Sequence, residues 1–154
     1  MLVTAPGREH PAGWERFGQE VVDPTAGGGP VRGVLTALEN LRTPLLVVAT
    51  VDMPGIGNEQ LQWLVSLLRA RDDLDVLMPS RLVGGKVQPE PFPAAFRMGA
   101  RPLVQRQLES GPSAGMQSLA KLPRGALVLS PQNWPDSVWT NLNRPEDLQA
   151  FLRE

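Results

Sequence analysis

Apolar and polar positions follow two alternating spacings along the chain, which predicts strands and helices in succession. Leu45–Thr50 is almost entirely apolar, as expected of a strand covered by helices on both faces. Before and after it, apolar side chains recur every three or four residues, the spacing that gives a helix one buried face. We expect Asn58 to cap the second of these helices. The two apolar stripes are Val31, Val34, Leu35, Leu38 and Leu41, and Leu61, Leu64, Val65 and Leu68.

Shorter segments continue this alternation to the end of the chain. Gly84–Gly85 predicts the turn of a hairpin, and the prolines in Pro91–Arg97 favour an edge strand, because proline cannot donate a ladder hydrogen bond. Alternating strands and helices predict an α/β protein with a mainly parallel sheet, in which Leu45–Thr50 is the central strand. Further strands are expected at 1–4, 20–23, 75–79, 126–129 and 137–140, and further helices at 100–109, 116–122 and 143–152.

Length, charge and composition narrow the class of protein. A chain of 154 residues fits a single domain spanning 1–154. With 15 Lys and Arg against 16 Asp and Glu, it lacks the positive excess that general nucleic-acid binding requires. The absence of Cys and the single His10 exclude disulfides, zinc–thiolate sites, iron–sulfur clusters and His-rich metal sites. The longest apolar run, Leu45–Ala49, is far shorter than the ~20 residues that span a bilayer, so we expect a cytoplasmic protein without membrane partners.

Two segments at the predicted strand ends have the chemistry of a ligand site, because ligands of open α/β sheets bind beyond the carboxyl ends of the strands. Gly27–Gly29 precedes a helix, where backbone amides can receive an anion or the edge of a base, although the same glycines also suit a flexible turn. Asp52 follows the best strand, a position that suits a divalent cation carrying a nucleotide phosphate. Asp52 equally suits a cap on the following turn.

A third candidate segment lies near the C-terminus. If 137–140 is a strand, Asn141 and Asn143 point the same way at its end and offer amide donors and acceptors to a ligand. Asn143 also has a structural explanation as the cap of the last helix, with Pro145 in its first turn. Asn141 is therefore the less explained of the two.

In their order and spacing, these segments resemble the molybdenum cofactor guanylyltransferase (MobA) family of MobA-like nucleotidyltransferases. Asp23 followed by Gly29–Leu38 is similar to the family's acidic residue and its Gly-Pro-Leu-Ala-Gly helix start. Leu46–Pro54 is similar to its strand ending in Asp-Met-Pro, and Gln88–Phe96 to its Pro-Leu-Phe stretch. Asn141–Leu148 resembles Asn-x-Asn-Thr-Pro-Glu-Asp-Leu. The resemblance implies a Rossmann-like three-layer αβα nucleotidyltransferase fold.

The resemblance also implies an activity and a set of site residues. Family members bind GTP with Mg²⁺, and the terminal phosphate of molybdopterin attacks the α-phosphate, which releases pyrophosphate. Asp52 would be the metal ligand and the catalytic residue, while Asp23 would contact the nucleotide. The remaining implied contacts are Thr4 near the guanine or ribose, Gly29 and Gly33 at the helix start, and Gln88, Asn141 and Asn143 toward the pterin.

The chain departs from the family at its front. The family begins with a strand, a Leu-Ala-Gly-Gly-x-Ser-x-Arg-Met-Gly loop and a Lys that cradle the triphosphate, and no such segment is found here. We expect an N-terminally truncated fold, a partner chain that supplies the strand, or a remnant without activity. Without that strand, its neighbours in the sheet have unpaired backbone.

Three functions follow from these expectations. The chain is a guanylyltransferase acting on GTP and molybdopterin, a non-catalytic domain that binds the cofactor and delivers it to a molybdoenzyme, or a related CTP-dependent nucleotidyltransferase. The absent front loop favours the second, and the order of the motifs favours the first.

Overall fold

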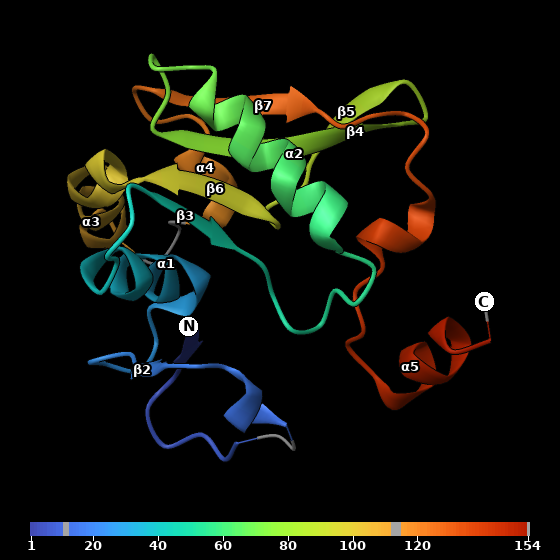
Figure 1. Cartoon of the computed structure of the whole chain (residues 1–154), viewed down its shortest axis with the longest axis horizontal. Helices are drawn as coiled ribbons and strands as arrows, with labels where there is room; N and C mark the ends of the chain where they lie inside the picture. The colour runs from blue at the N-terminus through green and yellow to red at the C-terminus, as the bar shows by residue number, and fades with distance from the viewer. Residues whose placement is uncertain (11–12, 112–114, 154) are drawn as a thin grey trace.

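A five-stranded sheet with helices on both faces forms the main body of the molecule (Figure 1). The computed structural model describes residues 1–10, 13–111 and 115–153. Among these residues, no helix is long and apolar enough to cross a membrane. The strands are β1 (Leu2–Thr4), β2 (Glu20–Val22), β3 (Leu45–Val48), β4 (Val76–Val83), β5 (Lys86–Pro89), β6 (Ala94–Arg97) and β7 (Gly125–Leu129). The α-helices are α1 (Gly29–Glu39), α2 (Asn58–Arg69), α3 (Arg101–Glu109), α4 (Met116–Leu119) and α5 (Pro145–Phe151), and the 3₁₀ helices are η1 (Trp14–Arg16), η2 (Met98–Ala100) and η3 (Asp136–Trp139).

Strand β4 is the centre of the larger sheet. β6 pairs antiparallel with its first residues, β5 pairs antiparallel with Ser80–Val83, and β7 pairs parallel with Val76–Ser80. β3 pairs antiparallel with β6, so β3, β4 and β7 run in one direction and β5 and β6 run in the other. β1 and β2 form a separate parallel pair. The α/β class is confirmed, with β3, β4 and β7 parallel to one another, and the predicted Gly84–Gly85 hairpin joins β4 to β5.

Two strands exchange the places that the sequence predicted for them. Within the described residues β3 pairs only with β6, so the segment expected to be central is an edge of the five-stranded sheet. β6, expected at an edge, lies between β3 and β4. The physical reason is that Pro91 and Pro93 precede β6, so every residue of the strand itself keeps its N–H donor.

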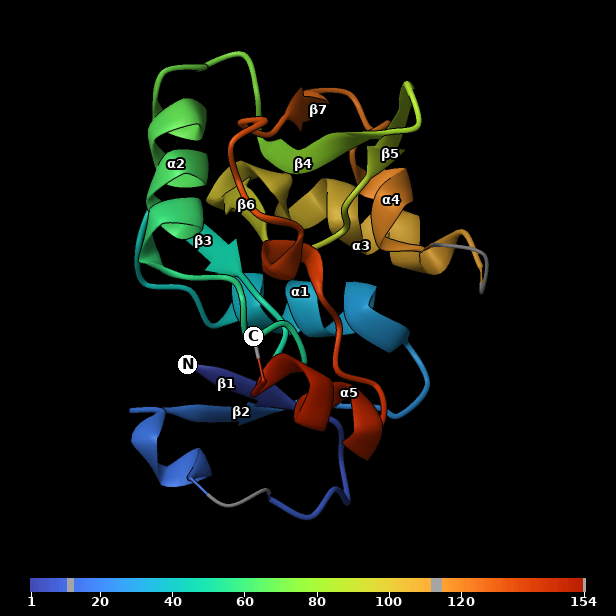
Figure 2. The same ribbon diagram turned by 90° about the vertical axis from the view of Figure 1, so that its right-hand side faces the viewer.

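Two apolar clusters lie on opposite faces of the sheet. Helices α1, α3 and α4 cover one face and α2 covers the other (Figure 2). Side chains alternate along the strands: Val76 and Met78 face α1, whereas Leu77 faces α2. This arrangement confirms the three-layer architecture. Of the predicted stripes, Val31, Val34, Leu35, Leu38, Leu64 and Leu68 are buried, while Leu41, Leu61 and Val65 are half-buried.

Two predicted caps lie one residue away from the observed ones. Helix α2 begins at Asn58, and its N-cap is Gly57, whose N–H donates to Gln60 Oε1 at 2.9 Å. Helix α5 has Arg144 as its N-cap, and Asp147 accepts from the N–H groups of Asn143 and Arg144 at 3.0 and 2.9 Å. In both helices a side chain from the first turn reaches back to the chain before it. Asn58 and Asn143 are therefore not caps.

The predicted strand at 137–140 is also wrong. Asp136–Trp139 forms the 3₁₀ helix η3, which leads into the segment containing Asn141 and Asn143. Pro135 at the N-cap fixes the start of this turn, and Val138 and Trp139 are both buried against the core. Two adjacent apolar residues facing the same core fit a tight helical turn and not an alternating strand.

Candidate functional site

The loop after β3 presents Asp52 at the carboxyl end of the sheet. Its side-chain oxygen Oδ1 is buried and has no hydrogen-bond partner. Its carbonyl oxygen accepts from the N–H of Leu142 at 2.7 Å, and the neighbouring Met53 is buried in the core. The loop is thus held at two points while Oδ1 is left for another partner. A turn-capping role would instead give this oxygen a backbone N–H donor.

Asp23 has the same unusual environment after β2. Its N–H donates to the carbonyl oxygen of Thr4 at 2.8 Å, which continues the pairing of β1 and β2, while its Oδ1 is buried without a partner. Thr50 Oγ1, Arg32 Nε and, within helix α1, Thr36 Oγ1 are also buried and unpaired. A buried polar atom without a partner costs about 1–3 kcal/mol, so such atoms are few in a folded protein. Asp23, Thr50 and Asp52 all follow strands of the two sheets.

Two glycines at the start of α1 have positive φ values that other residues rarely adopt. Gly27 has φ 91° and Gly29 has φ 56°, so a sharp turn explains both of them without a ligand. Gly33 lies beside Val3, and a Cβ there would make an ordinary contact at 3.9 Å, so the packing of α1 on β1 does not require a glycine. The predicted contacts of Gly29 and Gly33 with a cofactor stay predictions.

Thr4 is engaged in a polar cluster that the sequence did not predict. Its hydroxyl donates to Glu20 Oε1 at 2.7 Å, and His10 Nε2 donates to the same oxygen at 2.6 Å. Both hydrogen bonds lower the pKa of Glu20, and the one from His10 has the larger effect. His10 also stacks on Trp14 with ring centroids 4.2 Å apart. Strands were predicted at 1–4 and 20–23, but the pairing that places Thr4 diagonally across from Glu20 comes from the structure.

The three residues predicted to face the pterin lie in two separate parts of the structure. Asn141 and Asn143 are exposed, and the N–H of Leu142 between them ties their segment to Asp52. Gln88 lies on β5, where its amide donates to Glu90 Oε1 at 3.2 Å. The structure therefore brings the two asparagines to the Asp52 loop and joins Gln88 to a different polar group.

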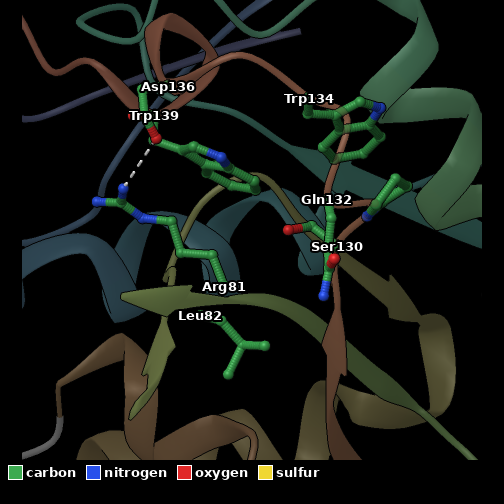
Figure 3. Close-up of a pocket in the computed structure, with 8 residues that line it drawn as sticks. Arg81, Leu82, Ser130, Gln132, Trp134, Asp136 and Trp139 are labelled. Atoms are coloured by element: carbon green, nitrogen blue, oxygen red, sulfur yellow. Dashed lines mark ion pairs between the residues drawn. The ribbon is translucent and has the colours of Figure 1, made fainter. Parts of the chain in front are cut away.

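A pocket of about 340 Å³ opens at the carboxyl ends of β4 and β7 (Figure 3). It is lined by Arg81 and Leu82 of β4, by Ser130, Pro131 and Gln132 after β7, and by Trp134, Asp136 and Trp139. Trp134 and Trp139 pack with a third indole, since Trp134 lies 5.0 Å from Trp63 and 6.0 Å from Trp139 between ring centroids, and they also form a wall of the pocket.

The donor set around Asp52 fits only one kind of metal site. The described residues contain no group of three His, Cys, Asp or Glu side chains that could hold an ion. Magnesium that arrives with a nucleotide needs only one or two carboxylates, because phosphate oxygens and water complete its shell. The unpaired Oδ1 of Asp52 meets that requirement.

The fold is the Rossmann-like fold of nucleotidyltransferases. The molybdopterin-guanine dinucleotide biosynthesis protein A of Archaeoglobus fulgidus has a similar structure, with a TM-score of 0.71 and 22% identity over 89% of this chain and 68% of that one. The 2-C-methyl-D-erythritol 4-phosphate cytidylyltransferase of Thermus thermophilus matches with a TM-score of 0.63 and 20% identity, over 99% and 82% of the two chains.

Residues 1–124 match the MobA-like NTP transferase domain, and the chain belongs to this family. A probable molybdenum cofactor guanylyltransferase of Thermococcus sibiricus is 28% identical over 152 residues, which cover 97% of this chain and 74% of the relative. The resemblance found in the motifs is thereby confirmed.

Proposed function

We propose that this chain binds GTP with Mg²⁺ and transfers GMP to molybdopterin. The observation that supports this most directly is the buried, unpaired Oδ1 of Asp52 at the carboxyl end of β3. The Thermococcus relative, described as a probable molybdenum cofactor guanylyltransferase, supports the choice of substrates.

In this proposal the chain itself supplies orientation and charge. Asp52 holds the triphosphate through a divalent cation, and Mg²⁺ would neutralise charge on the phosphate oxygens. Asp23, whose Oδ1 is also unpaired, accepts hydrogen bonds from the nucleotide. A phosphate oxygen of molybdopterin forms a bond to the α-phosphorus, the bond from that phosphorus to the β-phosphate oxygen breaks, and pyrophosphate leaves. Catalysis then depends on positioning more than on covalent participation of the protein.

A second candidate substrate is CTP. The Thermus cytidylyltransferase aligns with 99% of this chain, and a 4-diphosphocytidyl-2C-methyl-D-erythritol synthase from Anaerococcus prevotii aligns with 88%, at a TM-score of 0.63. These similarities concern the fold, so the base has to be tested directly.

The test is calorimetric titration of GTP and of CTP, each with Mg²⁺, into the full chain and into Asp52→Ala. We expect GTP to bind the wild-type chain and to lose about tenfold or more in affinity in the variant, because one charged contact is removed. Asp73→Ala is the matched control, since Asp73 is an exposed carboxylate that pairs with Arg71 on the surface.

Each outcome separates the candidate functions. If the chain binds CTP more tightly than GTP, CTP replaces GTP as the proposed donor. Equal affinity of the wild-type chain and Asp52→Ala for Mg²⁺–GTP would refute the metal-ligand role. Binding of both GTP and molybdopterin without release of pyrophosphate would favour the non-catalytic delivery domain.

A further inference from the structure

Strand β7 is an outermost strand of the larger sheet. Among the described residues it pairs only with β4, and both views show it at the border of the sheet (Figures 1 and 2). Its sequence, Gly125–Leu129, contains no charged residue and no proline. Natural edge strands carry lysine, proline or a bulge that prevents pairing with another chain. The edge strand β5 has Lys86 and Pro89, so β7 lacks a protection that β5 has.

The backbone of β7 leaves hydrogen-bonding groups on the side away from β4. The N–H of Val76 on β4 donates to the carbonyl oxygen of Arg124 at 3.1 Å. In a parallel pair, alternate residues of a strand bond to the neighbour, so the even-numbered residues of β7 face β4 and the backbone groups of Leu127 and Leu129 point outward. Neither of these two residues makes another backbone hydrogen bond with the described part of the chain. Their N–H and C=O groups can therefore pair with a further strand.

The side chains beside this free edge are apolar and exposed. Leu127 and Leu129 are 42% and 51% exposed. Leu127 is in register with Met78, which belongs to the cluster under α1, so both leucine side chains stand on that face of the sheet. At the start of β7 the same face is covered by the end of α4, since a Cβ on Gly125 would lie 2.7 Å from the carbonyl oxygen of Leu119. A strand added at this edge would gain backbone hydrogen bonds and apolar contacts together.

We propose that β7 pairs antiparallel with β7 of a second copy of this chain, about a two-fold axis at Leu127. In this register the two Leu127 residues exchange both of their backbone hydrogen bonds, and the N–H of each Leu129 donates to the carbonyl oxygen of Gly125 in the other copy. The N–H of Gly125 already donates to the carbonyl oxygen of Leu122 at 2.8 Å and takes no part. Each Leu129 then lies beside the end of the other copy's α4, and the two sheets become continuous.

A second copy fits this edge because the strand is complementary to itself. Two-fold pairing satisfies both edges at once and closes the assembly as a dimer. The paired strands bring no charges together, and the net charge of each copy is only −1, so electrostatic repulsion between the copies is small. Five residues at about 3.4 Å each give an edge of about 17 Å. Such a short edge predicts a dimer that dissociates on dilution and not a permanent one.

The experiment is sedimentation of the full chain over a series of concentrations, without nucleotide or metal, so its outcome is independent of the proposed function. Leu127→Lys places two like charges directly opposite each other at the axis, and Leu127→Glu does the same. We expect each variant to raise the dimer dissociation constant by about tenfold or more. An equimolar mixture of the two variants should restore the dimer, because lysine then faces glutamate. This rescue is specific to the two-fold register, in which residue 127 faces its own counterpart.

Val87→Lys is the matched control. Val87 is 55% exposed on the same face of the sheet, but it lies on β5, across β4 from β7, so this variant should dimerise as the wild-type chain does. At concentrations where the wild-type chain is a monomer, every variant should unfold near the wild-type temperature, because the substituted side chains are exposed.

Four results would overturn the proposal. They are a wild-type chain that stays monomeric at every concentration, a dimer that survives Leu127→Lys, a mixture of the lysine and glutamate variants that stays monomeric, and growth of the wild-type chain into open-ended assemblies. Loss of the dimer in Val87→Lys as well would also overturn it, since the copies would then meet through the face of the sheet and not through the edge of β7.

Discussion

At the scale of single residues, two aspartates stand out because each has a buried oxygen without a partner. Asp23 and Asp52 were singled out in the sequence, Asp52 by its place after an apolar strand and Asp23 by the motif that follows it. The burial of Oδ1 in both side chains required the surrounding chain, including the segment at Leu142. Glu20 was not singled out, because its partners His10 and Thr4 are ten and sixteen residues away.

Glu20 makes a testable contribution to stability that depends on pH. Hydrogen bonds from His10 and then Thr4 hold its pKa below the ordinary value of 4.5 in the folded chain. Since the folded pKa is the lower one, the contribution is present above pH 4.5 and is lost as the pH falls through the lowered pKa. Thermal unfolding followed from pH 7 to pH 3 should show a steeper decline below pH 4.5 for the wild-type chain than for Glu20→Gln.

The control for this pH effect is Glu146→Gln, which removes an exposed carboxylate in the first turn of α5. Its unfolding profile should decline as steeply as that of the wild-type chain. Parallel profiles for wild type and Glu20→Gln would mean that the cluster contributes nothing to folding.

At the scale of elements, periodicity predicted where most helices and strands lie along the chain, but not which strands are neighbours in the sheet. Helices α1, α2 and α3 and strands β4 and β7 lie where their patterns indicated, within a few residues. The edge position of β3 and the inner position of β6 depend on pairing between strands far apart in the chain. A local pattern of apolar residues carries no information about that pairing. The turn η3 replaced a predicted strand for a similar reason, since Val138 and Trp139 face the same core.

The contact between the Asp52 loop and η3 predicts the effect of one small substitution. A Cβ at Gly55 would collide with the carbonyl oxygen of Ser137 and lie 2.8 Å from Val138 Cα. Gly55→Ala should therefore lower the free energy of unfolding by about 1–3 kcal/mol and weaken Mg²⁺–GTP binding by displacing the loop. Chemical denaturation and calorimetry measure the two effects.

Gly18→Ala is the matched control, because nothing lies within 4 Å of a Cβ placed there. It should leave both stability and binding close to the wild-type values. Unchanged stability of Gly55→Ala would show that the loop adapts without strain.

At the scale of the whole molecule, one strand joins the two apolar clusters. On β6, Phe96 and Ala94 face α1 while Ala95 faces α2, and Phe96 is fully buried. Phe96→Ala should lower the free energy of unfolding by about 3–5 kcal/mol, because it removes a large side chain from a core that cannot close around the cavity. Phe17→Ala, at a residue 44% exposed, should cost about 0.5 kcal/mol or less. Denaturation of both variants measures the difference, and equal losses would contradict the place of Phe96 in the core.

The sequence by itself determined the class of fold, the main helices, the family and the acidic strand ends, because spacing and motif order are local properties of the chain. Only the tertiary structure decided that β3 is an edge, that the segment at Leu142 binds the Asp52 loop, and that a pocket forms at the carboxyl ends of β4 and β7. Arg81, Asp136 and Trp139 come together because β4 and η3 meet in space across more than fifty residues of sequence. Contacts at that separation depend on which strands pair and which faces are buried, and these follow from the packing of the whole chain.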